Sequence, residues 1–127
     1  MAGTASKLVI VLWSAGPDRP DLAAAPFVYA LAARALELDV EMHFTASAVR
    51  WLFDGVAAAA CTDRARSKTV YDFIGEAKDA GVRLYACAMA LAEHRRGETL
   101  LTEVDGIAGA ATAIGAGIEP STRTIVF

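Results

Sequence analysis

One stretch near the start of the chain, KLVIVLWS (residues 7–14), constrains the fold more than any other feature. It is a nearly continuous run of apolar, often β-branched side chains, and the glycine and prolines of the AGPDRPD that follows end it. A strand that is apolar on both faces belongs inside a parallel sheet, because helices must cover both of its faces. The run therefore predicts an α/β protein.

Helix-like and strand-like patterns alternate along the rest of the chain. Four segments have helical spacing or helix-type caps and are expected to be helices: residues 21–38, 47–55, 69–81 and 88–97. Three more are expected to be strands: residues 39–46, 82–87 and 122–127. The alternation predicts a single domain (residues 7–127) after a flexible tail (residues 1–6). Its fold is an open, mostly parallel sheet of about five strands with helices on both faces.

Two segments fit neither pattern clearly. Residues 56–68 combine alanines with a polar end that lacks periodicity, and we expect a mobile loop there. The segment with Gly106, Gly109, Gly115 and Gly117 is rich in small residues. Its spacing matches neither the Walker pattern nor the dinucleotide fingerprint, and no predicted strand leads into it. We expect a helix that packs closely through these small residues.

Composition and charge restrict the classes of function. No apolar run of the 127 residues approaches the roughly 20 that a membrane span needs. The first six residues lack the basic and apolar regions of a signal peptide, so we expect a soluble, cytoplasmic protein. The net charge of −3 argues against a nucleic-acid surface, which needs clustered Lys and Arg. Two basic groups, at residues 64–68 and 94–96, are either solvated surface or ligand sites.

In an open α/β sheet, ligands bind where the carboxyl ends of the strands turn into helices. Three predicted strands end in this way at Ser14, Thr45 and Cys87. Of these, Cys87 is the strong nucleophile. Unpaired backbone N–H groups and the positive end of the helix dipole favour its thiolate, which is the reactive form, so we expect a moderately lowered pKa. The alternative is that Cys87 is a small core residue, because cysteine is among the most often buried residue types.

Partners for such a thiol are not evident from the sequence. His43 and His94 are not placed next to Cys87, and each is expected to be a surface or packing residue. The chain has no CxxC motif, so neither a metal site nor a thioredoxin-like motif is predicted, and no cofactor is expected. The two cysteines, Cys61 and Cys87, are expected to be free thiols.

Four segments together resemble the DsrE/DsrF-like family of small sulfur-relay proteins over nearly the whole chain. They are AGPDRPDLAAAPFVYALAARALE, VEMHFTASAVRWLFDGV, VRLYACAMALAEHRRG and STRTIVF. The third is the most specific, because family members keep a sulfur-accepting cysteine in this strand-to-helix element. That cysteine corresponds to Cys87.

The resemblance implies a persulfide carrier. Cys87 would take the outer sulfur of a donor persulfide and pass it to a partner's thiol, in a homotrimer or homohexamer that works with donor and acceptor proteins. The family also contains members without a working cysteine. Cys61 lies where some relatives carry a second cysteine, so it is either a resolving thiol or an incidental one.

Two other classes of function stay open. In one, the protein is a non-catalytic oligomeric scaffold in which Cys87 is structural. In the other, it binds a small molecule in a pocket formed by Ser14, Gly16 and Thr45, with an anionic group at the N-terminus of the following helix.

Overall fold

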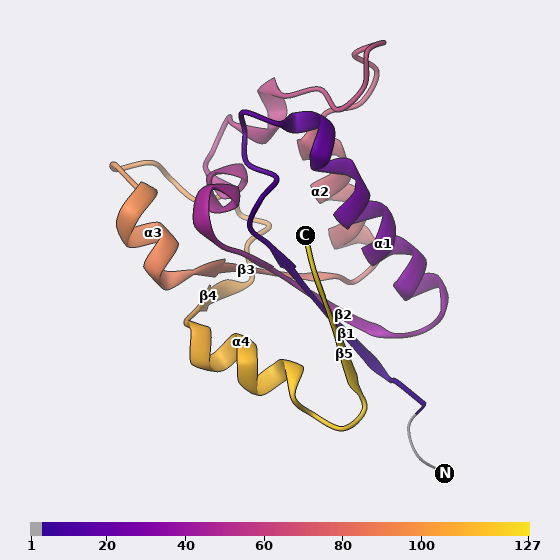
Figure 1. The fold of residues 1–127 in the computed structure, drawn as a ribbon. Helices are drawn as coiled ribbons and strands as arrows, with labels where there is room; N and C mark the ends of the chain where they lie inside the picture. The colour runs from indigo at the N-terminus through magenta and orange to yellow at the C-terminus, as the bar shows by residue number, and fades with distance from the viewer. Residues whose placement is uncertain (1–3) are drawn as a thin grey trace.

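The centre of the protein is an open sheet of five parallel strands (Figure 1). The computed structural model describes residues 4–127. The spatial order is β4-β3-β2-β1-β5. The strands are β1 (Lys7–Leu12), β2 (Asp39–Phe44), β3 (Arg83–Cys87), β4 (Gly106–Ala108) and β5 (Thr122–Val126). The predicted α/β class and the predicted strand number are confirmed.

Helices lie on both faces of this sheet, as predicted (Figure 1). The α-helices are α1 (Ala24–Ala35), α2 (Val70–Asp79), α3 (Ala88–His94) and α4 (Ala110–Gly117). Three 3₁₀ helices join them: η1 (Pro20–Leu22), η2 (Ala46–Leu52) and η3 (Ala57–Ala59). In Figure 1, α1 and α2 lie side by side on one face, α4 lies on the other, and α3 lies at the carboxyl end of β3.

The face toward α1 and α2 holds the hydrophobic core. Because side chains alternate along a strand, every second residue of the central strands points to this face. Ile10, Met42 and Leu84 lie in register there and are fully buried. Phe27 of α1 stacks against Phe73 of α2 with ring centroids 5.9 Å apart. The apolar side chains buried on this face stabilise the fold.

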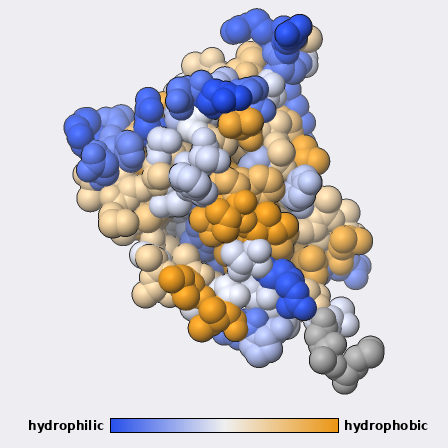
Figure 2. Space-filling model, in the orientation of Figure 1, coloured by the Kyte–Doolittle hydropathy of each residue, from blue (hydrophilic) through white to orange (hydrophobic). Residues whose placement is uncertain are grey.

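The opposite face is only partly covered by α4. All eight residues of α4 are at least partly exposed, and Ile114 and Ile118 are 63% and 75% exposed. Val126 of the neighbouring edge strand β5 is 58% exposed. Figure 2 shows hydrophobic surface over α4 and in the middle of this view. We call Ile114, Ile118 and Val126 the α4 apolar patch.

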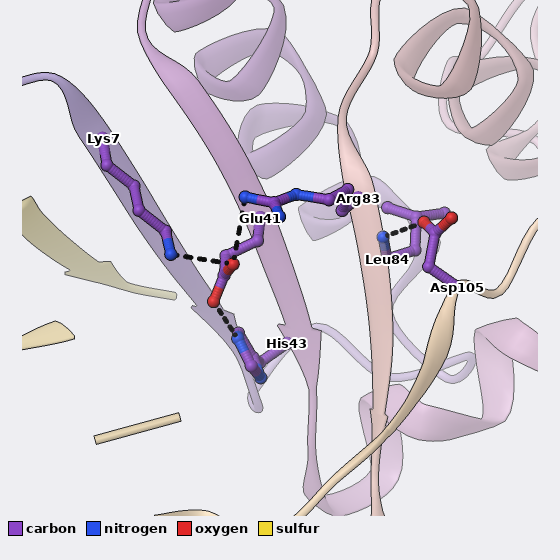
Figure 3. Close-up of polar contacts among 6 residues, drawn as sticks. All are labelled: Lys7, Glu41, His43, Arg83, Leu84 and Asp105. Carbon is purple, nitrogen blue, oxygen red and sulfur yellow. Dashed lines mark hydrogen bonds and ion pairs between the residues drawn. The ribbon is translucent and has the colours of Figure 1, made fainter. Parts of the chain in front are cut away.

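The structure differs from the prediction in two places. The α-helix expected over residues 47–55 is the 3₁₀ helix η2 (Ala46–Leu52), and the buried Trp51 fixes η2 by donating its Nε1–H to the Ala15 carbonyl at 2.5 Å. The glycine-rich segment is preceded by the short strand β4, which the sequence did not predict. Asp105 aligns β4 with β3, because its carboxylate accepts the Leu84 N–H at 2.7 Å (Figure 3).

The two segments expected to be flexible are described in part. Residues 1–3 of the predicted tail lie outside the described residues. Ser6 donates its N–H to the Ser121 carbonyl and accepts one from Asp39 at the start of the sheet. Within residues 56–68, η3 is followed by a turn in which Asp63 accepts the backbone N–H of Ser67 at 3.0 Å.

Candidate functional site

Cys87 occupies the junction between β3 and α3. It is the last residue of the strand and the N-cap of the helix, with extended backbone angles (φ −69°, ψ 126°). Its thiol is free and only partly buried. The helix begins here because the small residues Ala88 and Ala90 follow, and it buries Ala90 and Leu91 against the rest of the core. The position is the one predicted from the sequence.

The surroundings of Cys87 favour its thiolate. Burial raises the pKa of the Cys87 thiol, but hydrogen bonds from the Thr45 side chain and from the backbone of Ala90 and Met89 lower it, and the lowering prevails. The direction agrees with the lowered pKa expected from the strand-to-helix junction. The Thr45 contribution comes from the residue that follows β2 and caps η2, and not from α3.

A cavity of about 230 Å³ opens beside the thiol on the α4 side of the sheet. Its floor comes from the sheet through Val11, His43, Thr45 and Cys87, and its walls include Met89 of α3 and the first residues of α4. The lining is mostly apolar. The cavity is small, and the Cys87 thiol is its nucleophile. The N-termini of two helices, α3 and α4, lie at its edge.

His43 enters this cavity from β2, although the sequence placed it on a less buried face. Its side chain is 6% exposed, and its ring stacks on Tyr85 with centroids 5.2 Å apart. The expectation of a packing residue is correct in that respect. The sequence nevertheless missed that His43 lines the same cavity as Cys87. That depends on the pairing of β2 with β3, in which His43 lies opposite Tyr85, two residues before Cys87.

Glu41 holds His43 in place within a buried charge cluster (Figure 3). Oε1 of Glu41 lies 2.9 Å from Nε2 of His43, and Oε2 lies 3.1 Å from Nζ of Lys7 and 3.4 Å from the Arg83 guanidinium. Burial raises the pKa of Glu41, but the bonds to His43 and Lys7 lower it more. Glu41 is therefore an ionised carboxylate with a cation on each side.

Of the three predicted pocket residues, only Thr45 lies in the cavity with Cys87. Ser14 and Gly16 are not part of its lining, and neither is the second cysteine, Cys61. The end of β1 is taken up by the C-terminus, since the Ser14 N–H bonds to the Phe127 carbonyl at 3.2 Å. Gly16 packs against the start of η2 so closely that an added Cβ would lie 2.5 Å from the Ser47 hydroxyl.

Cys61 and the basic groups lie elsewhere on the surface. Cys61 forms an isolated bridge with Thr69, just before α2. Lys68 of the first basic group lies over the Phe73 ring at 4.0 Å and pairs with Glu76. In the second group, Arg96 donates to the Glu93 carbonyl at 2.7 Å. Local contacts account for these two basic side chains.

The part of the chain that the structure describes has neither a metal site nor a membrane-spanning helix. Between residues 4 and 127, no three His, Cys, Asp or Glu side chains come together as a metal site would require. No helix in the same part of the chain is long and apolar enough to cross a membrane.

Comparison with known proteins gives the family. A search of curated proteins found no match. The model of the DsrE/DsrF-like family matches residues 7–127, which covers every element of the sheet and the Cys87 junction. A match over nearly the whole chain, on a five-stranded parallel α/β sheet, shows that this protein belongs to the DsrE/DsrF-like family.

Proposed function

We propose that this protein is a persulfide carrier that accepts sulfane sulfur on Cys87 and passes it on within a sulfur relay. Membership in the DsrE/DsrF-like family supports a sulfur-relay role in general. The observation that carries the finer proposal is the Cys87 thiol itself. It is partly exposed, its pKa is lowered, and it borders a small cavity.

The chemistry needs only a nucleophilic thiolate. The Cys87 thiolate attacks the outer sulfur of a donor persulfide, the donor's S–S bond breaks, and the donor leaves as a thiolate. Cys87 then holds the outer sulfur as a hydropersulfide. An acceptor thiolate attacks this sulfur in turn, and Cys87 leaves as a thiolate. One S–S bond forms as another breaks, so no external oxidant or reductant is required.

The partners of such a carrier are a donor and an acceptor protein. Their persulfide or thiol must enter the cavity, whose volume of about 230 Å³ admits a side chain but not a folded surface. A relay of free thiols works in a reducing compartment, and we therefore propose a cytoplasmic location.

We propose that the α4 apolar patch is covered in a homotrimer or homohexamer. Its three side chains are 63%, 75% and 58% exposed, and contiguous exposed apolar side chains are common at interaction surfaces. Ile114, Ile118 and Val126 also border an apolar hollow between α4 and β5. An assembly through this patch would lie next to the Cys87 cavity, since Ile114 lines both.

Sulfur loading tests the proposal. Wild type, Cys87→Ser and Cys61→Ser are incubated with a small persulfide donor, and their intact masses are measured. We expect wild type and Cys61→Ser to gain the mass of one sulfur atom, with no gain in Cys87→Ser. Sulfur retained by Cys87→Ser would contradict the assignment to Cys87.

The exposed α4 apolar patch also favours a second candidate function, an oligomeric scaffold in which Cys87 has a structural role. Alkylation separates the two candidates. A carrier's Cys87 reacts with iodoacetamide in the assembled protein, whereas a structural Cys87 reacts only after the protein is unfolded. Cys61→Ser is the form to use, because it leaves one thiol to report.

A further inference from the structure

One ring nitrogen of His43 is held by Glu41, and the residue lines the Cys87 cavity. Nε2 bonds to Glu41, and the two nitrogens of an imidazole point in widely different directions (Figure 3). Among residues 4–127, no group bonds to Nδ1, and the one buried side-chain polar atom without a partner is Thr122 Oγ1. Nδ1 is therefore not sealed in the core. It is open to the cavity that His43 lines.

The charge on Glu41 determines which nitrogen carries the hydrogen. An ionised carboxylate can only accept hydrogen bonds, so Nε2 of His43 must donate to it. The neutral ring then presents the bare lone pair of Nδ1 to the cavity. A carboxylate that fixes a histidine tautomer in this way leaves the other nitrogen able to take a proton.

The strand register brings this lone pair near the sulfur that Cys87 would carry. Thr45 follows His43 on the same face of β2, about 6.6 Å further along at ~3.3 Å per residue. Cys87 lies beside Thr45 on β3, because Phe44 is in register with Ala86. A persulfide extends the thiol by about 2 Å, the length of an S–S bond. The carried sulfur and an incoming thiol thus share the cavity with Nδ1.

We propose that His43 is a catalytic base for sulfur release: Nδ1 takes the proton of the acceptor thiol as that thiol attacks the outer sulfur on Cys87. Glu41 is a positioning residue, which fixes the tautomer and supports the imidazolium that forms. This inference rests on the proposed function of Cys87 as a persulfide carrier, and it adds how a protonated acceptor can react.

The step balances in atoms and electrons. The acceptor S–H bond breaks, its proton moves to Nδ1, and the acceptor sulfur bonds to the outer sulfur. The S–S bond to Cys87 breaks, and its electron pair stays on the Cys87 thiolate. The imidazolium then returns its proton to this thiolate or to water, so the products are an acceptor hydropersulfide and a free Cys87.

The charged groups around His43 come from three strands. Glu41 of β2 contacts the ring, and Lys7 of β1 and Arg83 of β3 pair with the other oxygen of the same carboxylate. Tyr85 of β3 stacks on the ring. The α4 residues that line the cavity, Ala110, Ala113 and Ile114, carry no charge.

Single-turnover transfer at different pH values tests this role. Cys61→Ser protein is loaded with persulfide on Cys87, freed of donor and mixed with β-mercaptoethanol. The loss of sulfur is followed by intact mass from about pH 5.5 to about pH 10, which spans the pKa of an ordinary thiol. The test variant adds His43→Gln, whose amide can still donate to Glu41 but cannot take a proton. His94→Gln is the matched control on the chain's other histidine.

We expect His43→Gln to slow transfer by roughly 100-fold near neutral pH, the usual scale for a general base. The ratio of the parent rate to the His43→Gln rate should fall toward one at the highest pH, where the acceptor is already a thiolate. His94→Gln should match the parent protein. Equal rates in His43→Gln and parent at all pH values would overturn the inference alone, as would a ratio that is the same at every pH. A parent protein that cannot be loaded would overturn the proposed function and this inference with it.

Nitrogen NMR keeps the inference testable if His43→Gln does not fold. The His94→Gln variant retains His43 as its one histidine, so a ¹⁵N spectrum reports that ring. We expect the tautomer with hydrogen on Nε2 and a bare Nδ1, and we expect the Nδ1 resonance to move when Cys87 is loaded with sulfur. Hydrogen on Nδ1 in the neutral ring, or an Nδ1 resonance unmoved by loading, would overturn the inference.

Discussion

The two faces of the sheet differ in how tightly they are packed and in the side chains that they carry. The face under α1 and α2 is dry and packed, with Phe27, Met42 and Leu84 fully buried. The face under α4 holds a buried charge cluster around Glu41, a cavity with Cys87, and an exposed apolar patch. Charged groups, a cavity and exposed apolar side chains would destabilise a packed core, and all three lie on the face that α4 covers only in part. The comparison indicates that one face stabilises the fold and the other carries the chemistry.

The largest expected effect is on the packed face. Phe27→Ala removes a fully buried ring that packs against Phe44 and Phe73. We expect a loss of about 3–5 kcal/mol in the free energy of unfolding, because a cavity replaces the ring. Urea unfolding measures it. Ile118→Ala on α4 is the control and should change stability by less than about 0.5 kcal/mol, since that side chain is 75% exposed. Equal losses in the two variants would contradict the division between faces.

The second effect concerns the charge cluster. Glu41→Gln leaves Lys7 and Arg83 without their carboxylate, and we expect a loss of about 1–3 kcal/mol at neutral pH. The pKa of Glu41 is lower in the folded protein than its ordinary value of 4.5. Its contribution is therefore complete above the unfolded pKa and disappears as the pH falls through the folded one.

Urea unfolding of wild type and Glu41→Gln, measured over the pH range in which Glu41 takes up a proton, gives the difference between their free energies of unfolding directly. The two stabilities should converge as the pH falls below about 4.5. A difference that stays constant into acid would mean that lost packing, and not lost charge, explains the variant.

A smaller effect is expected at the thiol. Thr45→Val removes the hydroxyl that favours the Cys87 thiolate and keeps the shape of the side chain. We expect the pKa of Cys87 to rise, so that iodoacetamide alkylation near neutral pH slows by about threefold to tenfold, the usual free energy of one hydrogen bond. The pH dependence of alkylation, measured in Cys61→Ser, reports it. An unchanged midpoint would show that the helix backbone alone sets the acidity.

The smallest effect on folding is expected at the α4 apolar patch. Ile118→Asp places a charge on an exposed apolar surface, so the monomer should lose less than about 0.5 kcal/mol. Its effect on assembly should be clear, with light scattering showing a monomer where wild type forms a trimer or hexamer. A monomeric wild type, or an unchanged assembly in Ile118→Asp, would contradict the proposed use of the patch.

The sequence was most informative where local pattern decides structure. The apolar run of residues 7–14 predicted a strand buried on both faces, and the strand-end rule placed Thr45 and Cys87 where they lie together. Ser14 also follows a strand, but it does not line the cavity of Thr45 and Cys87. The end of β1 is filled by the C-terminus and η2, which are distant in sequence.

The features that the sequence missed depend on strand register. β4 has three residues, too few for any periodicity, and its pairing depends on Asp105. His43 alternates with apolar neighbours as a solvent-facing residue would. The signal that could have identified it is the spacing Glu41, His43, Thr45, which puts an acid, an imidazole and a hydroxyl on one face of β2. Only the pairing of β2 with β3 shows that this face leads to Cys87.

The most direct test of the account is one full cycle of loading and discharge on Cys87. Cys61→Ser protein is loaded from a small persulfide donor, freed of donor, discharged with an acceptor thiol and loaded again, with the intact mass recorded at each stage. We expect the gain of one sulfur, its complete loss to the acceptor and an equal second gain, with no gain at any stage once Cys87 is also changed to Ser. A Cys87 that stays unmodified in the folded protein, or that gains sulfur and cannot release it, would contradict a persulfide carrier.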